Sequence, residues 1–189
     1  MNTSSNSDLA KDDELELFNS SLLTRLPNLP KENGLLVRPL RSTDYDKGFI
    51  QLLGQLTDVG NITKDQFLNR FFKMKTASGY YVVIVEDLNG GEVVGSATLV
   101  VEQKFIHNCA LKGRLEDVVV NSKYRGRHLG KLLVSTISQL SRSLQCYKLS
   151  LDCRDRLIGF YESLGFQREL GNANSLNMRF ETTPEHSRL

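Results

Sequence analysis

Cysteine is scarce in this chain of 189 residues. Only Cys109, Cys146 and Cys153 occur, and no two of them form a CxxC pair. An odd number without that spacing supports neither a disulfide framework nor a zinc site, and it suits a reducing compartment. A chain of this length buries roughly 70% of its unfolded surface, so it can build a core without such cross-links. We therefore expect a metal-free protein.

Long apolar runs and a strong charge of one sign are also missing. No stretch of about 18 apolar residues occurs, and the N-terminus lacks the basic and apolar regions of a secretory signal. The formal net charge is +2, from 24 Lys+Arg and 22 Asp+Glu. This charge is too small for general attraction to nucleic acid or membranes. We expect a cytoplasmic protein with no membrane span and no nucleic-acid partner.

The ends of the chain differ from its body. Residues 1–14 are rich in Ser, Asn and Asp, which predicts disorder. Leu15, Phe18, Leu22 and Leu26 follow at helical spacing, which predicts a short amphipathic helix. We divide the chain into a flexible N-terminal tail carrying that helix (1–33), one domain (34–181) and a C-terminal tail (182–189).

Hydrophobic periodicity predicts a mixture of strands and helices in the body. The predicted strands are 34–40, 80–87, 92–104, 113–121, 146–153, 166–171 and 175–181. The predicted helices are 44–56, one that follows a Thr63–Gln66 capping box, 129–144 and 157–164. The order βααβββαβαββ contains a strand-helix-strand crossover, which requires at least one parallel pair in a mixed sheet. The fold class is therefore α/β, of the mixed α+β type.

The most informative segment is KYRGRHLGK, residues 123–131, which leaves a strand and opens a helix. A glycine-containing turn at that place directs unpaired backbone N–H groups toward one point, and this predicts a phosphate site. Gly126 and Gly130 have three residues between them, whereas a Walker turn requires four, and Leu132 follows Lys131, so a Walker turn is excluded. The Rossmann spacing fails as well. A solvated basic helix start remains the alternative.

This turn resembles the acetyl-CoA site of the GNAT acetyltransferases, whose fingerprint is Q/R-x-x-G-x-G/A. Arg125 and Gly130 match its ends, and His128 replaces the middle glycine. Within that family the chain resembles the glucosamine 6-phosphate N-acetyltransferases, in the segments KFIH (104–107), RLEDVVV (114–120), LGKLL (129–133), CYKLSLDC (146–153), FYESLGF (160–166) and NMRF (177–180). The resemblance implies a GNAT fold with a mostly antiparallel mixed sheet and helices on both faces.

The resemblance also implies a reaction. The acetyl group of acetyl-CoA would move to the amine of D-glucosamine 6-phosphate, giving N-acetylglucosamine 6-phosphate and CoA in UDP-N-acetylglucosamine biosynthesis. Direct transfer in a ternary complex is expected, because no Cys or Ser has an activating neighbour in the sequence. The family further implies a homodimer whose late strand reaches the other subunit. The alternatives are another amine or a protein lysine as acceptor, a non-catalytic CoA-binding homologue, and a module that binds RNA or an acidic protein.

Site residues follow from the same resemblance. The backbone of the 118–120 strand would pair with pantetheine amides and donate to the carbonyl oxygen, and the turn would hold the pyrophosphate. The cofactor-binding set is Val118, Val119, Val120, Arg125, Gly126, Arg127, His128, Leu129, Gly130, Lys131, Asp152 and Tyr161. Tyr161 would protonate the leaving thiolate, and Asp152, Glu116, Asp117 or a water that they hold would accept the amine proton. The substrate-binding set is Thr57, Lys104, His107, Glu116, Asp117, Tyr147, Lys148 and Arg179.

Strand alternation gives two further expectations. Glu116 and Asp117 are neighbours, so they point to opposite faces and at most one enters a given pocket. In CYKLSLDC, Lys148 and Asp152 share a face of an apparently interior strand, which is costly unless that face meets water, a partner or a ligand. An edge strand with a solvated face is the alternative. Leu157 stands where the family often has an asparagine before its FY helix.

Overall fold

The computed structural model describes residues 14–27, 34–171 and 175–178. The chain divides after Leu151 into two compact units. The first unit contains α1 (Ser21–Thr24), β1 (Leu35–Pro39), α2 (Phe49–Leu53), α3 (Lys64–Ala77), β2 (Tyr80–Asp87), β3 (Glu92–Gln103), α4 (Ile106–Cys109), β4 (Leu111–Val120), the 3-10 turn η1 (Ser122–Tyr124), α5 (Leu129–Ser143) and β5 (Cys146–Ser150). The second unit contains η2 (Asp155–Leu157) and α6 (Ile158–Glu162).

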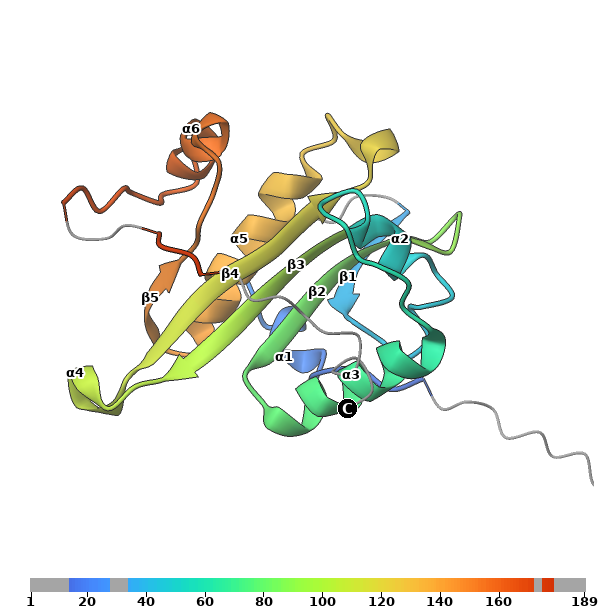
Figure 1. Cartoon of the computed structure of the whole chain (residues 1–189), viewed down its shortest axis with the longest axis horizontal. Helices are drawn as coiled ribbons and strands as arrows, with labels where there is room; N and C mark the ends of the chain where they lie inside the picture. The colour runs from blue at the N-terminus through green and yellow to red at the C-terminus, as the bar shows by residue number, and fades with distance from the viewer. Residues whose placement is uncertain (1–13, 28–33, 172–174, 179–189) are drawn as a thin grey trace, which may run out of the picture. The chain divides into compact units, whose positions relative to one another are not determined.

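The first unit is built on a five-stranded sheet in the order β1-β2-β3-β4-β5 (Figure 1). The β1–β2, β2–β3 and β3–β4 pairs are antiparallel, and only β4–β5 is parallel. The β2–β3 turn closes as predicted, with the Gly91 N–H donating to the Asp87 carbonyl at 2.7 Å. Helix α5 connects β4 to β5, and a crossover of that length is what a parallel pair needs. The predicted mixed, mostly antiparallel sheet is confirmed.

Helices cover both faces of this sheet. On one face, Val82 and Ile84 of β2 pack in one core cluster with Phe49, Phe67 and Phe71 of α2 and α3. Successive strand residues alternate between the faces, so Val83 and Val85 point the other way, toward α5. That side is tightly packed, because a Cβ added at Gly95 would lie 3.2 Å from Leu133 Cδ1 of α5 and 3.4 Å from Val85 Cβ.

The segment before β1 packs on the domain rather than trailing from it. The Leu17 N–H donates to the Leu40 carbonyl at 2.8 Å, next to a bridge between Glu16 and Arg41. Leu17 is 4% exposed and belongs to the core cluster. Helix α1 is shorter than the run predicted from Leu15, which is 39% exposed. The remainder of the predicted N-terminal tail, and residues 182–189, lie outside the described residues.

Four predicted elements differ from the structure. The helix predicted over 44–56 is limited to α2, because Gly48 at its N-cap has φ +84° and the preceding residues form turns. Strand β5 ends at Ser150 and not at 153, and residues 166–171 and 175–178 form no strand. A short apolar pattern forms a strand only where a partner strand pairs its backbone, and the pattern does not supply that partner. Residues 179–181 lie outside the described chain. The Thr63–Gln66 capping box is present as predicted.

Candidate functional site

The turn before α5 presents an uncapped helix N-terminus. Gly126 has φ +82° and His128, the N-cap residue, has φ 58°, so both adopt the left-handed conformation. The His128 side chain does not cap the helix. The N–H groups of Leu129, Gly130 and Lys131 lie in the first turn, where an α-helix offers them no internal acceptor. Together with the helix dipole they form a site suited to a phosphate.

His128, which replaces the fingerprint's middle glycine, adopts the left-handed conformation that glycine favours. Only the conformation favours glycine at Gly126, since a Cβ there would meet no protein atom within 4 Å. A non-glycine residue in the left-handed region costs about 1 kcal/mol, and His128 adopts that region with its side chain exposed. A histidine at this position is therefore compatible with a left-handed turn before α5.

Contacts from other elements fix this turn in place. The Ser122 N–H donates to Gln55 Oε1, beyond the end of α2, at 2.8 Å. The Tyr124 hydroxyl donates to the Asp87 carboxylate at the end of β2. The Arg127 guanidinium carbon lies 5.3 Å from the centre of the Tyr124 ring. We predicted no site role for Gln55, Asp87 or Tyr124, because their hydrogen bonds join segments that are far apart in the sequence.

Strand β4 has an open edge next to this turn. Its pairing with β5 runs from Leu111, opposite Cys146, to Arg114, opposite Ser150. Beyond that point, within the described residues, β4 pairs only with β3 up to Val120. An extended ligand carrying amides could add to this edge as a strand would.

The direction of the β4 amides can be assigned from one hydrogen bond. The Asn121 N–H donates to the Val94 carbonyl on β3 at 2.9 Å. Successive N–H groups of a strand point to opposite edges, so those of Val120 and Val118 point away from β3, toward the open side. Of the three valines predicted to donate an N–H, these two have the required direction, whereas the same alternation directs the Val119 N–H toward β3.

A β-bulge at Asp117 interrupts the alternation of β4. Asp117 has φ 52°, and the register shifts so that Thr98 opposes Glu116 whereas Ser96 opposes Val119. A Cβ at Gly113 would lie 2.6 Å from Ser141 Oγ of α5, so that position faces α5. Val119 is an even number of residues further along, yet it packs on the opposite face. The bulge inserts one extra residue between Glu116 and Val119, so strict alternation does not hold along that part of β4, and the opposite faces expected for Glu116 and Asp117 stay a prediction.

The two predicted carboxylates of β4 have different surroundings. Glu116 forms an ion pair with Arg114, two residues before it. Asp117 reaches the surface, yet its pKa is raised, first by partial desolvation and second by the negative charge of Glu116. A raised pKa makes a carboxylate a stronger proton acceptor.

A charged face extends from Glu116 toward the far end of the sheet. Glu102 forms ion pairs with Lys104 and, at 3.8 Å, with Lys112. The hydrogen bond from Lys104 is the largest cause of the lowered pKa of Glu102. Lys148 of β5 is the register partner of Lys112, so the two lysines lie side by side on this face. The structure thus brings Lys104 and Lys148 to one region.

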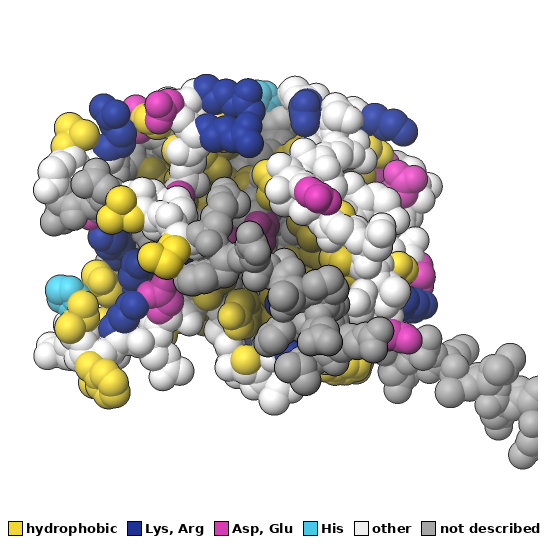
Figure 2. Space-filling model, in the orientation of Figure 1, with side chains coloured by type: hydrophobic (Ala, Val, Ile, Leu, Met, Phe, Trp, Pro, Cys, Tyr) yellow, Lys and Arg dark blue, Asp and Glu magenta, His cyan; other side chains and the backbone are white. Residues whose placement is uncertain are grey.

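His107 and Tyr147 also come together, with ring centres 4.6 Å apart. His107 lies in α4, a short left-handed turn at the end of the β3–β4 hairpin. Hydrophobic side chains are exposed at this end of the hairpin (Figure 2), where Phe105 is 96% exposed. Tyr147 is 45% exposed, and β5 is the edge strand of the described sheet. Among the described residues, β5 is therefore an edge strand with a solvated face, which is the alternative and not the interior position that the sequence favoured.

The remaining predicted substrate residues are less informative. Thr57 is exposed in the loop after α2, where its N–H donates to the Leu53 carbonyl at 3.2 Å. Arg179 lies outside the described residues.

Tyr161 and Asp152 belong to the second unit. Tyr161 is 9% exposed, with ring centres 5.0 Å from Phe160 and 5.9 Å from Phe166. Burial, and secondly the charge of Cys153, raise the pKa of the Tyr161 hydroxyl. Asp152 is exposed and contributes to a raised pKa of Cys153, after desolvation and Asp155. The hydroxyl of Tyr161 therefore keeps its proton through the neutral range, as a general acid requires.

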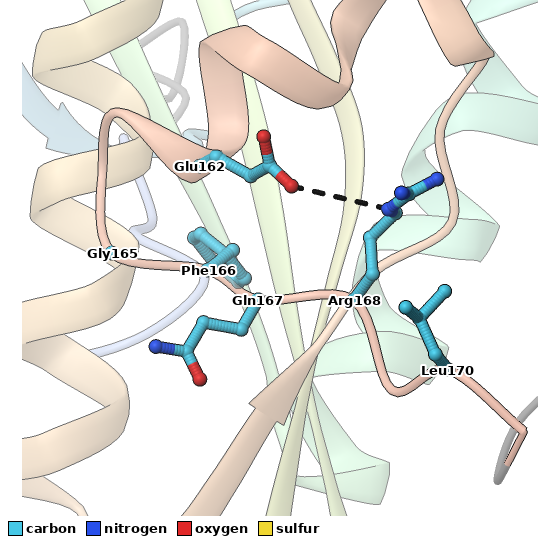
Figure 3. A pocket seen from close by; sticks show the side chains of 6 residues that line it. All are labelled: Glu162, Gly165, Phe166, Gln167, Arg168 and Leu170. Atoms are coloured by element: carbon cyan, nitrogen blue, oxygen red, sulfur yellow. Dashed lines mark ion pairs between the residues drawn. The ribbon is translucent and has the colours of Figure 1, made fainter.

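The second unit also has a hollow of about 400 Å³ (Figure 3). Glu162 and Arg168 reach toward one another there and form an ion pair at 4.0 Å. The other lining residues are Gly165, Phe166, Gln167 and Leu170. No predicted site residue lines it, so we assign it no role.

Metal and membrane features are absent from the described part of the chain. No group of His, Cys, Asp and Glu residues there is arranged to hold a metal ion. Among those residues, no helix combines the length and apolar character needed to cross a bilayer.

An open-edged strand followed by a phosphate-binding turn and a helix defines a class of CoA-dependent acyltransferases, and the chain belongs to the acetyltransferase (GNAT) family, whose model matches residues 49–166. It is 57% identical over 155 residues to the "probable glucosamine 6-phosphate N-acetyltransferase" of Drosophila melanogaster, covering 82% of this chain and 71% of that protein. It is 37% identical to glucosamine 6-phosphate N-acetyltransferase 1 of Dictyostelium discoideum, over 73% of this chain and 88% of the relative. The crystal structure of the Arabidopsis thaliana glucosamine-6-phosphate N-acetyltransferase superposes with a TM-score of 0.74 at 34% identity, covering 78% of this chain and 99% of that one. The expected GNAT fold is confirmed.

Proposed function

We propose that this protein transfers the acetyl group of acetyl-CoA to the amine of D-glucosamine 6-phosphate, giving N-acetylglucosamine 6-phosphate and CoA. The observation that carries the proposal is the uncapped α5 N-terminus, with its left-handed turn, placed at the end of the open β4 edge. The names of the relatives support the choice of sugar. We further propose a cytoplasmic homodimer that serves UDP-N-acetylglucosamine synthesis.

The residues present suit acetyl-CoA. The backbone N–H groups of Leu129, Gly130 and Lys131 would hold its diphosphate, with Arg125 and Arg127 adding positive charge. The open edge of β4 would pair with the amides of its pantetheine arm. When bound, the thioester supplies an activated acetyl group, and the N–H of Val118 or Val120 would stabilise negative charge on its carbonyl oxygen.

Two proton transfers accompany the acyl transfer. The ammonium of the sugar must lose a proton before it attacks, and the leaving thiolate must gain one. Asp117 is our first choice of base because its pKa is raised, with Glu116, Asp152 or a bound water as the other choices. Tyr161 would protonate the thiolate, since its burial keeps the hydroxyl protonated.

The charged face around Glu102 would receive the sugar phosphate. A phosphate needs cations and hydrogen-bond donors, and Lys104 and Lys148 supply them beside the His107–Tyr147 pair. Lys112, which is paired with Glu102, lies beside Lys148 and adds to the positive charge of this face. Thr57, and Arg179 in trans from a second subunit, complete the proposed substrate set.

A thiol-release assay with purified protein tests the proposal. Acetyl-CoA is supplied together with glucosamine 6-phosphate, glucosamine, another phosphorylated amino sugar or a lysine peptide. Release that depends on glucosamine 6-phosphate supports the proposal, whereas release with the peptide alone favours a protein acceptor. Binding of acetyl-CoA in calorimetry without release from any acceptor identifies a non-catalytic homologue. A protein that binds RNA in a steeply salt-dependent manner, and not acetyl-CoA, would be the binding module instead.

A further inference from the structure

Tyr124, at the start of the turn before α5, connects that turn to the β2–β3 hairpin. Its ring lies 5.3 Å from the guanidinium carbon of Arg127, and its hydroxyl donates to the carboxylate of Asp87. That carboxylate is itself fixed at the hairpin, because it accepts the Asn89 N–H at 2.9 Å. A chain of contacts therefore runs from the hairpin turn, through Asp87 and Tyr124, to Arg127.

The electrostatics keep this chain of contacts in one protonation state. The hydrogen bond from Tyr124 is the largest cause of the lowered pKa of Asp87, and the charge of Arg127 lowers it further. The same hydrogen bond raises the pKa of the Tyr124 hydroxyl. At neutral pH the carboxylate is ionised and the phenol is protonated, so the hydroxyl remains a donor.

The aromatic contact restricts a side chain that would otherwise be mobile. Arginine has a long side chain with several rotatable bonds, and it loses that rotamer freedom when it binds a ligand. Holding it in advance on an aromatic face reduces that loss and increases affinity. Stacking uses the face of the guanidinium, whereas its N–H donors lie in the plane, at the edge from which arginine binds phosphate.

We propose that Tyr124, anchored by Asp87, is a positioning residue that holds Arg127 toward a phosphate of CoA and so sets affinity for the cofactor. This inference rests on the proposed function, and it extends the cofactor site to two residues of no assigned role. The phosphate belongs either to the diphosphate or to the ribose 3′-position, and the test separates these sources. Because Tyr124 acts through Arg127, it affects cofactor affinity and leaves kcat unchanged.

The test compares three variants by calorimetric titration with acetyl-CoA and by steady-state kinetics. Tyr124→Leu removes the ring and the hydroxyl, and we expect the Kd for acetyl-CoA to rise about fivefold. Tyr124→Phe keeps the ring and removes the anchor, so a rise of about twofold is expected. Tyr45→Phe is the matched control, because it removes a phenol that donates to the Ile62 carbonyl at 2.9 Å far along the chain from the turn. The control should leave the Kd unchanged.

The decisive arm repeats Tyr124→Leu in an Arg127→Ala background. If Tyr124 acts through Arg127, the second substitution adds no further rise in Kd. An equal rise in that background, an unchanged Kd in the single variant, or a fall in kcat at unchanged Kd would each overturn the proposal. Titration with dephospho-CoA then locates the contact. The effect of Tyr124→Leu disappears there if Arg127 binds the 3′-phosphate, and it persists if Arg127 binds the diphosphate.

The same measurements distinguish a failure of the proposed function from a failure of the positioning role. If the wild-type protein binds no acetyl-CoA, both proposals fail. If the wild-type protein binds it and acetylates glucosamine 6-phosphate while Tyr124→Leu binds equally well, only the positioning role fails.

Discussion

Substitution of Asp44 by Asn is expected to destabilise the protein strongly. Asp44 is fully buried and accepts hydrogen bonds from Arg38 Nη1 at 2.8 Å and Nη2 at 2.6 Å. It also accepts the Arg41 N–H at 2.7 Å. Arg38, 3% exposed, binds Glu86 at 2.6 Å on its other side. This cluster fixes the turn that leads into α2. Gln55, just beyond α2, accepts a hydrogen bond from Ser122 in the turn before α5.

The expected loss of stability follows from the negative charge that Asn lacks. Breaking a buried ion pair by neutralising one partner costs about 3–5 kcal/mol, because the other charge stays buried. Arg38 keeps Glu86, so we expect the lower end, about 3 kcal/mol. For a chain of this size each kcal/mol changes the Tm by about 2–4 °C, so the Tm should fall by about 6–12 °C.

The chain offers a matched control two residues away. Asp46 forms an ion pair of 2.7 Å with Lys64, but their side chains are 57% and 45% exposed. Exposed pairs contribute about 0–1 kcal/mol, so Asp46→Asn should shift the Tm by less than about 4 °C. Thermal unfolding followed by circular dichroism measures both. Equal Tm values for the two variants would refute the reasoning from burial.

A pH titration of the wild type examines the same cluster. Burial raises the pKa of Glu86, but the hydrogen bonds from Arg38 and Lys47 outweigh it, and the net direction is downward. A carboxylate whose pKa is lowered on folding stabilises the protein above its unfolded pKa of about 4.3 and loses that contribution as the pH falls through the folded pKa. The Tm should therefore fall on acidification below about pH 4.3, and in Glu86→Gln this dependence should be weaker.

Three other predictions concern the site. Gly126→Ala places an alanine at φ +82°, at a cost of about 1 kcal/mol, so the Kd for acetyl-CoA should rise about fivefold. Gly159→Ala, in α6 and also without a close neighbour, is the control and should keep or raise the Tm. A normal Kd for Gly126→Ala would contradict the role of the turn. Tyr161→Phe should lower kcat at least about tenfold if thiolate protonation limits the rate. Because burial raises the pKa of the Tyr161 hydroxyl, the wild-type rate should show no loss from its ionisation below about pH 10. Full turnover by the variant would remove Tyr161 from the mechanism. Lys148→Met should raise the KM for glucosamine 6-phosphate and leave the KM for acetyl-CoA unchanged. Lys73→Met, at an exposed lysine of α3, is the control. If both variants have the same KM for the sugar phosphate, the phosphate binds elsewhere.

Local patterns predicted most elements of the fold. The run YYVVIVED is strand β2 over the predicted residues, and the leucines after His128 form the buried side of α5. The Thr63–Gln66 box starts α3 as expected. These predictions succeed because the information is contained within one turn or one strand. The helix predicted over 44–56 is limited to α2 because Gly48 adopts φ +84° and the residues before it form turns, which the hydrophobic spacing does not reveal.

The candidate site was predicted in part. The turn at Gly126 is visible in the sequence, because a glycine before a helix is a local signal. The bulge at Asp117 has no such signal, since nothing in RLEDVVV indicates an extra residue in the register. The contacts of Tyr124 with Asp87 and of Ser122 with Gln55 join residues more than thirty positions apart.

The amino-acid sequence by itself determined the strand and helix types, the phosphate-binding turn and the family resemblance, because each depends on residues that are neighbours in the chain. Only the tertiary structure decided which edge of β4 stays open, which of its amides point there, and which charged side chains lie together. Those features depend on register and packing between distant segments, and a shift of one residue in a strand moves its side chains to the other face.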